Sequence, residues 1–298
     1  MSDQQSDQQS AQESAQQADR QLPIGVFDSG MGGLTVLSAL AKAMPNENFI
    51  YLGDSARLPY GTKSSDTVVR YARQASKELV RRGVKALVVA CNTASASALK
   101  ILAEDFTPLP VYGVVDPGAQ AAAVQADASG VLVLATESTI LGGAYQRALL
   151  RENPSLPVYG RACPLWVTLA EQGWVGDQAT SLTQHALKHG LRGFLREAPQ
   201  RSMQAPQQPK TVLLGCTHFP VFRKQIEALV GADVQVVDSA QTTAITVSDD
   251  LSKLGLLRDG PAANHEMVFL ATDGVARFRK VGGYFFGGPL RNVSLVDL

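Results

Sequence analysis

Short apolar runs rich in Val, Ile and Leu recur along this chain, and most of them are followed by a segment with helical spacing. The runs occupy residues 24–27, 48–52, 86–90, 111–115, 130–135, 211–215, 234–237 and 267–271. A strand followed by a helix, repeated many times, predicts right-handed βαβ units on largely parallel sheets. The sequence therefore predicts an α/β fold with mostly parallel strands.

Two of these runs echo each other. Residues 86–93 read ALVVACNT and residues 211–218 read TVLLGCTH, so each is a buried strand that ends in a cysteine and a polar residue before a helix. The echo favours two similar open α/β domains over one wide sheet. Each cysteine would then lie at the carboxyl end of its own sheet, where such folds bind ligands. We expect the active site in the cleft between the two domains.

The expected domain boundaries follow from this duplication. The first domain comprises residues 22–115 and 240–298, and the second comprises residues 116–239. Residues 1–21 precede both domains and contain eight Gln and four Ser, with no aliphatic residue larger than Ala after the first Met. Such a segment cannot bury enough apolar surface to offset its chain entropy, so we expect a disordered tail.

The charge balance excludes some partners. The 298 residues carry 27 Lys+Arg against 27 Asp+Glu, so no basic field exists to hold a phosphate backbone, and we expect no nucleic acid partner. No apolar run approaches the ~18 residues of a membrane span, and the N-terminus lacks the pattern of a secretion signal. Three widely spaced cysteines fit a reducing compartment better than a disulfide framework. We therefore expect a cytoplasmic protein that does not contact a membrane.

Cys91 and Cys216 each follow a strand and precede a helix. A thiol at a helix N-terminus feels the positive end of the helix dipole, which predicts a pKa below the usual ~8.5 and a larger thiolate fraction. Packing as a small buried side chain is the alternative for either cysteine alone. Two cysteines at matching positions of two halves favour a chemical role. Cys163 lacks this context, and we expect it to be a packing residue.

His218 lies two residues after Cys216, close enough in sequence to form a hydrogen bond that poises the thiol. A helix cap or a surface position is the alternative for this histidine. We expect no metal site, because the chain has no CxxC motif and His185, His189 and His265 have no ligand spacing with His218.

Residues 27–33 read FDSGMGG, which is a strand end, a polar pair and a glycine-rich turn before a helix. Glycines let an anion approach the backbone N–H groups, so the turn suits a carboxylate or a phosphate. The turn is not a dinucleotide fingerprint, because Thr35 stands where that motif requires Gly. We interpret Asp28 as a polar group that faces a cleft, with a helix cap as the alternative. The loop at 53–61, GDSARLPYG, is expected at the same edge of the sheet.

Six motifs together resemble those of the glutamate racemases in the cofactor-independent aspartate/glutamate racemase superfamily. In chain order they are FDSGMGGL, GDSARLPYG, VVACNTAS, GVVDPG, LLGCTHFP and VDSA. The resemblance covers nearly the whole chain apart from the tail. This chain departs from the family at Ser55, where Thr is frequent, and at Gly142, where Ser is frequent.

The resemblance implies two catalytic cysteines, Cys91 and Cys216, assisted by Asp28 and His218 respectively. One thiolate would remove the Cα proton of an amino acid while the other thiol protonates the opposite face, so no pyridoxal phosphate or other cofactor is implied. The implied substrate-binding residues are Asp28, Ser29, Tyr60, Gly61, Asn92, Thr93, Thr139, Glu171, Thr217 and His218.

The resemblance also indicates the substrate and the partners. Aspartate racemases of the superfamily tend to carry Glu where this chain has His218, which favours glutamate as the substrate. The implied function is interconversion of L-glutamate and D-glutamate, which supplies D-glutamate for peptidoglycan synthesis. The resemblance further implies a cell-wall precursor as an effector, and we also expect a homodimer. The alternatives are an aspartate racemase, a non-enzymatic amino-acid binder and a thiol redox sensor.

Overall fold

The computed structural model describes residues 17–176, 179–194, 208–259 and 266–298. Its strands form two sheets. The first sheet contains β1 Ile24–Asp28, β2 Phe49–Gly53, β3 Ala86–Val89, β4 Val111–Gly113, β9 Met267–Ala271 and β10 Val293–Leu295. The second sheet contains β5 Val131–Ala135, β6 Val158–Ala162, β7 Thr211–Gly215 and β8 Gln235–Asp238. We call the two sheets, each with its covering helices, the first unit and the second unit.

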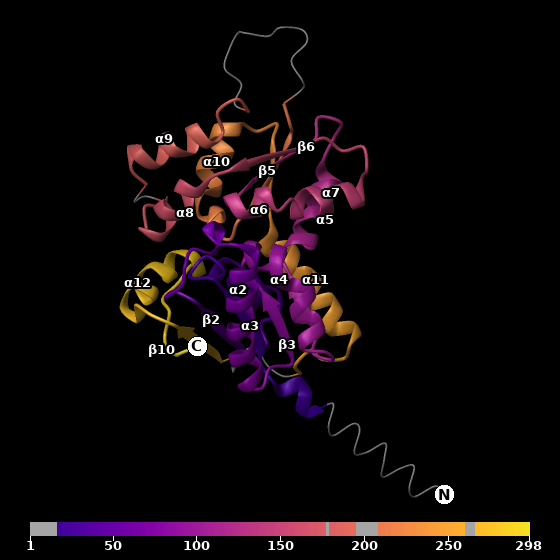
Figure 1. The fold of residues 1–298 in the computed structure, drawn as a ribbon, viewed down its shortest axis with the longest axis vertical. Helices are drawn as coiled ribbons and strands as arrows, with labels where there is room; N and C mark the ends of the chain where they lie inside the picture. The colour runs from indigo at the N-terminus through magenta and orange to yellow at the C-terminus, as the bar shows by residue number, and fades with distance from the viewer. Residues whose placement is uncertain (1–16, 177–178, 195–207, 260–265) are drawn as a thin grey trace, which may run out of the picture.

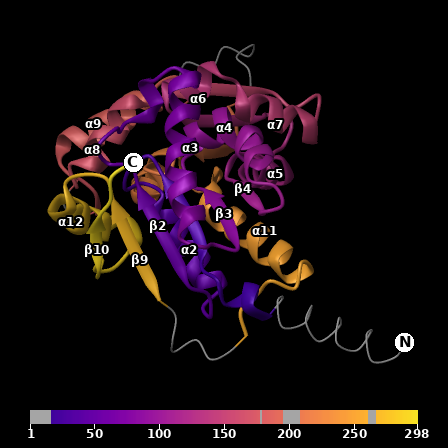
Figure 2. The same cartoon turned by 60° about the horizontal axis from the view of Figure 1, so that its bottom comes forward.

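All of the described strand pairs are parallel, and the two sheets lie one beyond the other along the long axis of the molecule (Figure 1). The strand order is β10-β9-β2-β1-β3-β4 in the first sheet and β6-β5-β7-β8 in the second. The last part of the chain returns to the first sheet, where β9 lies beside β2 (Figure 2). The central strands β1, β2, β5 and β7 are buried along their whole length, which explains their continuous apolar runs.

Two strands were not predicted from the sequence, namely β6 and β10. Both lie at an edge of a sheet. β6 reads VYGRA and contains no fully buried residue, while β10 has only three residues. An edge strand is partly open to solvent and lacks a continuous apolar run, which is the signal that identified the other strands.

The described helices connect and cover the strands. The α-helices are α2 Leu34–Ala43, α3 Ser65–Arg81, α4 Asn92–Asp105, α5 Val115–Gln125, α6 Glu137–Leu141, α7 Ala144–Glu152, α8 Pro164–Glu171, α9 Ser181–Gly190, α10 Arg223–Val230, α11 Ser239–Lys253 and α12 Val275–Phe286, with short 3-10 helices η1 Tyr60–Thr62 and η3 Phe219–Phe222. Helix α11 packs against α2 and α5 and so links the two units. Within the described ranges, no helix is long and apolar enough to cross a membrane.

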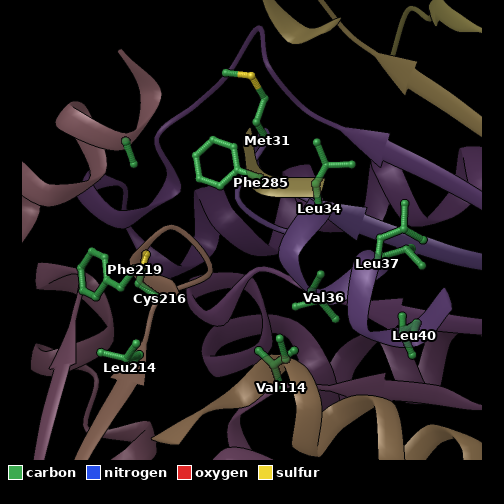
Figure 3. Packing of buried hydrophobic residues seen from close by; sticks show 14 of the residues in the cluster. Met31, Leu34, Val36, Leu37, Leu40, Val114, Leu214, Cys216, Phe219 and Phe285 are labelled. Carbon is green, nitrogen blue, oxygen red and sulfur yellow. The ribbon is translucent and has the colours of Figure 1, made fainter. Parts of the chain in front are cut away.

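One hydrophobic cluster runs through both units (Figure 3). Leu34 and Leu37 of α2 belong to the same cluster as Leu214 of β7 and Phe219 of η3. Met31, in the glycine-rich turn, lies next to Phe285 of α12 in this cluster. Apolar packing therefore holds the ends of β1 and β7 close to each other, where the polar residues of both units meet.

Residues 17–21 are helical, although the sequence placed them in a disordered tail. The Arg20 Nε donates to the carbonyl of Gly255 at 2.7 Å, and the Lys85 Nζ donates to the carbonyl of Arg20 at 2.8 Å. Polar contacts made by the backbone and Arg20 hold this segment, and a composition argument based on apolar burial does not detect them. Residues 1–16 of the expected tail lie outside the described residues.

Candidate active site

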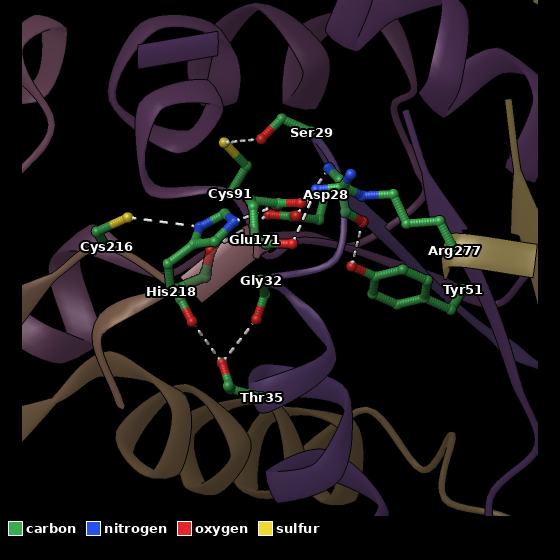
Figure 4. Close-up of polar contacts among 12 residues, drawn as sticks. Asp28, Ser29, Gly32, Thr35, Tyr51, Cys91, Glu171, Cys216, His218 and Arg277 are labelled. Carbon is green, nitrogen blue, oxygen red and sulfur yellow. Dashed lines mark hydrogen bonds and ion pairs between the residues drawn. The ribbon is translucent and has the colours of Figure 1, made fainter. Parts of the chain in front are cut away.

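Three strand ends bring the expected site residues together. Asp28 is the last residue of β1, Cys91 lies two residues after β3, and Cys216 directly follows β7. Because β1 and β3 are parallel neighbours, their carboxyl ends lie at the same edge of the first sheet. Figure 4 shows both thiols within one group of polar side chains that comes from both units.

Cys91 is the N-cap of α4. Its thiol donates a hydrogen bond to the Ser29 Oγ at 3.4 Å, and its Sγ accepts one from the Ala94 N–H at 3.5 Å. Burial, together with the neighbouring Asp28 carboxylate, raises the pKa of the Cys91 thiol to about 12, while the hydrogen bonds with Ser29 and Ala94 lower it by less. The sequence-based prediction of a lowered pKa is therefore wrong for Cys91, because burial outweighs the helix N-terminus.

Cys216 is the first member of a chain of three contacting side chains. The His218 Nδ1 lies 3.7 Å from the Cys216 Sγ, and the His218 Nε2 lies 2.6 Å from the Glu171 Oε1. Burial by itself lowers the pKa of His218, but hydrogen bonds and charges from Cys216 and Glu171 outweigh burial and raise the pKa well above 6.5. The raised pKa favours the protonated imidazole, whose two N–H groups can donate to both neighbours.

Asp28 is fully buried and connects the two units. Its Oδ2 accepts from the Gly30 N–H at 2.9 Å, and the Thr217 Oγ1 donates to its Oδ1 at 3.5 Å. Burial raises the pKa of Asp28, while the positive charge of His218 and backbone N–H groups oppose the rise. The N-cap of α2 is Gly33, with no side-chain cap, so Asp28 is not the helix cap that the sequence left as an alternative.

The glycine-rich turn lets the two units approach closely. A Cβ atom on Gly32 would lie 2.5 Å from the His218 Nδ1 and 2.6 Å from the Thr217 Oγ1. A Cβ atom on Gly33 would lie 2.5 Å from the Cβ of Asp28. Side chains at these two positions would push the site residues apart, which is the physical reason for glycine here.

Asn92, the first residue of α4, contacts the second unit. Its Nδ2 donates to the Tyr145 hydroxyl at 2.6 Å and to the Ser239 Oγ at 3.4 Å. Its Oδ1 is buried and has no hydrogen-bond partner within the described residues. Leaving a buried acceptor unpaired is unfavourable, so this oxygen suits a donor group on a bound ligand.

Three threonines form a cluster of hydroxyl groups beside Asn92. The Thr93 Oγ1 lies 3.0 Å from the Thr136 Oγ1 and 3.2 Å from the Thr139 Oγ1. Gly61 packs on the same cluster, because a Cβ atom there would lie 2.6 Å from the Thr136 Cβ. The structure thus brings Thr93, Thr139 and Gly61 together from three separate segments.

Both the hydroxyl and the ring of Tyr60 already have partners within the protein. Its hydroxyl donates a short hydrogen bond to the Asp54 carboxylate, and its ring packs against Phe27 and Tyr71. The phenol is therefore occupied, and a contact between Tyr60 and a ligand would have to come from its backbone.

Four polar residues beside the site were not singled out from the sequence: Tyr51, Thr136, Tyr145 and Ser239. Tyr51 donates from its hydroxyl to the Gly30 carbonyl at 3.0 Å, beneath the glycine-rich turn (Figure 4). Ser239 belongs to the VDSA motif, so that motif could have indicated it. Tyr51 has no such signal, because a tyrosine within an apolar strand resembles any core residue.

The site is closed to solvent. Cys91 and Cys216 are each 5% exposed, and His218 and Glu171 are each 6% exposed. Two hollows of about 590 and 380 Å³ lie nearby, and neither cysteine lines them. Within the described residues, no group of three or more His, Cys, Asp or Glu is arranged to hold a metal ion.

Comparisons with known proteins identify relatives. Residues 24–246 match the family model described as Asp/Glu/Hydantoin racemase. A glutamate racemase of Geobacter metallireducens is 45% identical over 276 residues, which cover 92% of this chain and 96% of that protein.

Solved structures share the fold. Glutamate racemase from Francisella tularensis, in complex with D-glutamate, superposes with a TM-score of 0.82 at 34% identity and covers 93% of this chain and 98% of that one. Escherichia coli glutamate racemase, in complex with L-glutamate and the activator UDP-MurNAc-ala, gives a TM-score of 0.75 at 26% identity over 93% of this chain and 98% of that one. The predicted fold class, two similar open α/β units with parallel sheets, is therefore confirmed. The chain belongs to the Asp/Glu/Hydantoin racemase family.

Proposed function

We propose that this protein interconverts L-glutamate and D-glutamate. The observation that carries the proposal is the pair of buried thiols, Cys91 and Cys216, which follow matching strands of two sheets and face one group of polar side chains. The glutamate racemase of Geobacter metallireducens, 45% identical, supports glutamate as the substrate, as does the Francisella tularensis relative solved with D-glutamate.

The reaction needs a proton carrier on each face of the Cα atom. A thiolate on one side removes the Cα proton and becomes a thiol, while the thiol on the other side gives its proton to the carbanion and becomes a thiolate. The substrate is thereby inverted, and the two cysteines have exchanged their protonation states. Helix N-termini and hydroxyl groups around the substrate stabilise the charge that develops on the carboxylate.

The two thiols are prepared for different starting roles. Cys216 has an imidazole as its hydrogen-bonding partner, with the His218 Nδ1 3.7 Å from its Sγ. Burial beside Asp28 raises the pKa of Cys91 to about 12, which favours the thiol form. By the family's assignment of faces, Cys216 then deprotonates L-glutamate while Cys91 protonates the resulting carbanion to give D-glutamate.

The remaining site residues bind the substrate. The hydroxyls of Ser29, Thr93, Thr139 and Thr217 are donors for its carboxylates, together with the N–H groups at the start of α4. Asp28 and the unpaired Asn92 Oδ1 are acceptors for its ammonium group. Glu171 holds His218, and the turn at Tyr60 and Gly61 packs beside the threonine cluster.

The same proposal includes the use of the product, the oligomeric state, the domain boundaries and an effector. The product D-glutamate supplies peptidoglycan synthesis in the cytoplasm, and the protein acts as a homodimer. Residues 22–115 with 240–298 and residues 116–239 form its two domains. The Escherichia coli relative was solved with the activator UDP-MurNAc-ala, which supports a cell-wall precursor of this class as an effector.

Polarimetry on purified protein tests the activity. We expect L-glutamate and D-glutamate each to lose optical rotation without added cofactor, and with undiminished rate after incubation with a metal chelator. Aspartate and other amino acids in the same assay should react far more slowly. Turnover of aspartate in place of glutamate, or dependence on a metal or pyridoxal phosphate, would contradict the proposal.

A further inference from the structure

A closed site raises the question of how an anionic substrate gains access to it. The hollow of about 380 Å³ borders the site, because Glu171, the partner of His218, is one of its lining residues. Its volume falls in the range of about 300–1,000 Å³ that is typical of ligand pockets. The cavity wall comes from both units, with Leu58 and Pro59 on one side and Val167 and Thr168 on the other.

Among the residues described as lining this cavity, two side chains are acidic and one is basic. Glu171 and Asp273 contribute carboxylates, and both repel a substrate that itself carries a net negative charge. Arg277 of α12 is the single cationic side chain among the residues described as lining the cavity. Its guanidinium is therefore the group that can attract a carboxylate to this cavity, which we call the mouth of the site.

Arg277 also joins the two units. Its Nη2 donates to the backbone carbonyl of Glu171, the last residue of α8, at 2.9 Å (Figure 4). The start of α12 is fixed to the first unit, because the Ser55 hydroxyl donates to the Asp273 carbonyl at 2.6 Å and the Asp273 N–H donates to the Ser55 Oγ at 2.9 Å. The bond from Arg277 to Glu171 therefore crosses from the first unit to the second.

This bond occupies one of the five N–H groups of the guanidinium, and no second partner lies within the described residues. Arginine presents its donors as a planar fork that matches a carboxylate in two-point geometry. A guanidinium released from the Glu171 carbonyl would have this fork available for a carboxylate.

We propose that Arg277 captures a carboxylate of the incoming substrate at this mouth and then returns to the Glu171 carbonyl, which closes the site. The proposal rests on glutamate as the substrate of the site. Arg277 is accordingly a positioning residue that affects binding and release, and it does not contact the reacting Cα atom.

Steady-state racemisation of glutamate by Arg277→Gln, Arg277→Lys and the unchanged protein tests the proposal. The matched control is Arg279→Gln, two residues further along α12, since Arg279 is exposed and has no hydrogen bond or ion pair within the described residues. Each protein is measured at about 0.01 M and about 1 M NaCl, between which the screening length falls from about 30 Å to about 3 Å.

We expect Arg277→Gln to lower kcat/KM about tenfold at low salt, as the loss of electrostatic attraction predicts, with a much smaller change in kcat. The salt dependence of kcat/KM should flatten in Arg277→Gln and persist in Arg277→Lys, which keeps the charge. Arg279→Gln should behave as the unchanged protein. The fall in kcat/KM must be equal from both enantiomers, because they have equal free energies.

The proposal would be overturned if Arg277→Gln had the same kcat/KM and the same salt dependence as the unchanged protein. An equal fall in kcat and kcat/KM, or a failure of Arg277→Lys to keep the salt dependence, would also overturn it. The proposed function fails in a different way, since the unchanged protein would then not racemise glutamate at all.

Discussion

The two thiols differ in the groups that surround them. Cys91 faces the Ser29 hydroxyl and the Asp28 carboxylate, whereas Cys216 faces an imidazole that Glu171 holds in place. A carboxylate near a thiol opposes its ionisation, and a protonated imidazole favours it. The same residue type therefore meets different partners at the two positions of the proposed reaction.

Replacing either Cys91 or Cys216 with Ser should abolish racemisation, because a serine hydroxyl is a far weaker base than a thiolate and each face needs its own proton carrier. A substrate analogue that loses a leaving group after Cα deprotonation separates the two faces, since this reaction needs one base only. We expect Cys91→Ser to process the L analogue and Cys216→Ser the D analogue, measured as release of the leaving group.

Cys163→Ser is the matched control for these variants. Cys163 is also buried, and burial raises its pKa to about 12, but it follows the edge strand β6 outside the polar group. The activity of Cys163→Ser should stay close to that of the unchanged protein. Loss of activity toward the same enantiomer in both site variants would rule out the two-base mechanism.

His218→Asn should change how stability depends on pH. The pKa of His218 is higher in the folded protein than the ~6.5 of the unfolded chain, so its protonated form stabilises the fold. This stabilisation is fully present below pH ~6.5 and is lost as the pH rises through the folded value. Denaturant titrations of both proteins between about pH 5.5 and pH 9 measure it. The difference in free energy of unfolding should shrink as the pH rises, and a constant or growing difference would contradict the raised pKa.

At the scale of elements, the turn between β1 and α2 sets the geometry of the site. It is short, follows Asp28, carries Ser29, and brings Gly32 against His218 and Thr217 of the second unit. Strand ends are rigid supports, so polar groups placed there keep their relative positions. The units approach each other this closely only because the turn has no side chain at Gly32, its closest point.

Gly32→Ala tests this close approach. The added Cβ would lie 2.5 Å from the His218 Nδ1, so His218 or the turn must shift. A displacement of about 1 Å in a catalytic group costs about a hundredfold in rate. We therefore expect kcat to fall about a hundredfold in the racemisation assay while circular dichroism still shows the folded protein.

Gly288→Ala is the control for Gly32→Ala, because the nearest atom to its added Cβ would be 4.0 Å away, on the Phe286 ring. It should keep parental activity. Parental activity in Gly32→Ala as well would show that the turn does not set the position of His218.

At the scale of the whole molecule, a buried ion pair stabilises the end of the first unit that lies away from the active site. The Lys85 Nζ lies 2.5 Å from the Glu47 Oε2, and both side chains are almost completely buried. The Lys85 Nζ also donates to the Arg20 carbonyl, and the Glu47 Oε1 accepts from the Arg258 N–H. Four segments distant in sequence are thereby held at one place.

Lys85→Met should lower the free energy of unfolding by about 3–5 kcal/mol, because it leaves the Glu47 carboxylate buried without a partner. Lys85→Met combined with Glu47→Leu should recover much of this loss, since no unpaired charge remains. Denaturant titration measures both changes.

Lys100→Met provides the comparison, because Lys100 pairs with Glu104 at 3.9 Å and its side chain is 90% exposed. An exposed pair contributes about 0–1 kcal/mol, so this variant should unfold almost as the unchanged protein does. Equal losses of unfolding free energy in Lys85→Met and Lys100→Met would show that breaking the buried pair costs no more than breaking the exposed one.

The local sequence determined the central strands of the fold and the place of the site at their ends. Apolar runs of strand length identified the central strands, and the cysteine after β3 and the one after β7 marked the carboxyl ends where the site lies. These features depend only on neighbouring residues, since strand periodicity and turn chemistry act over a few positions.

Tertiary structure decided the rest. The pKa of Cys91 is raised because the closed units bury it, whereas the sequence showed only its helix N-terminus. Glu171 meets His218 across 47 positions of sequence, and Arg277 meets Glu171 across 106. Burial and such distant contacts arise from the packing of one sheet unit against the other, and no local pattern encodes how two surfaces will meet.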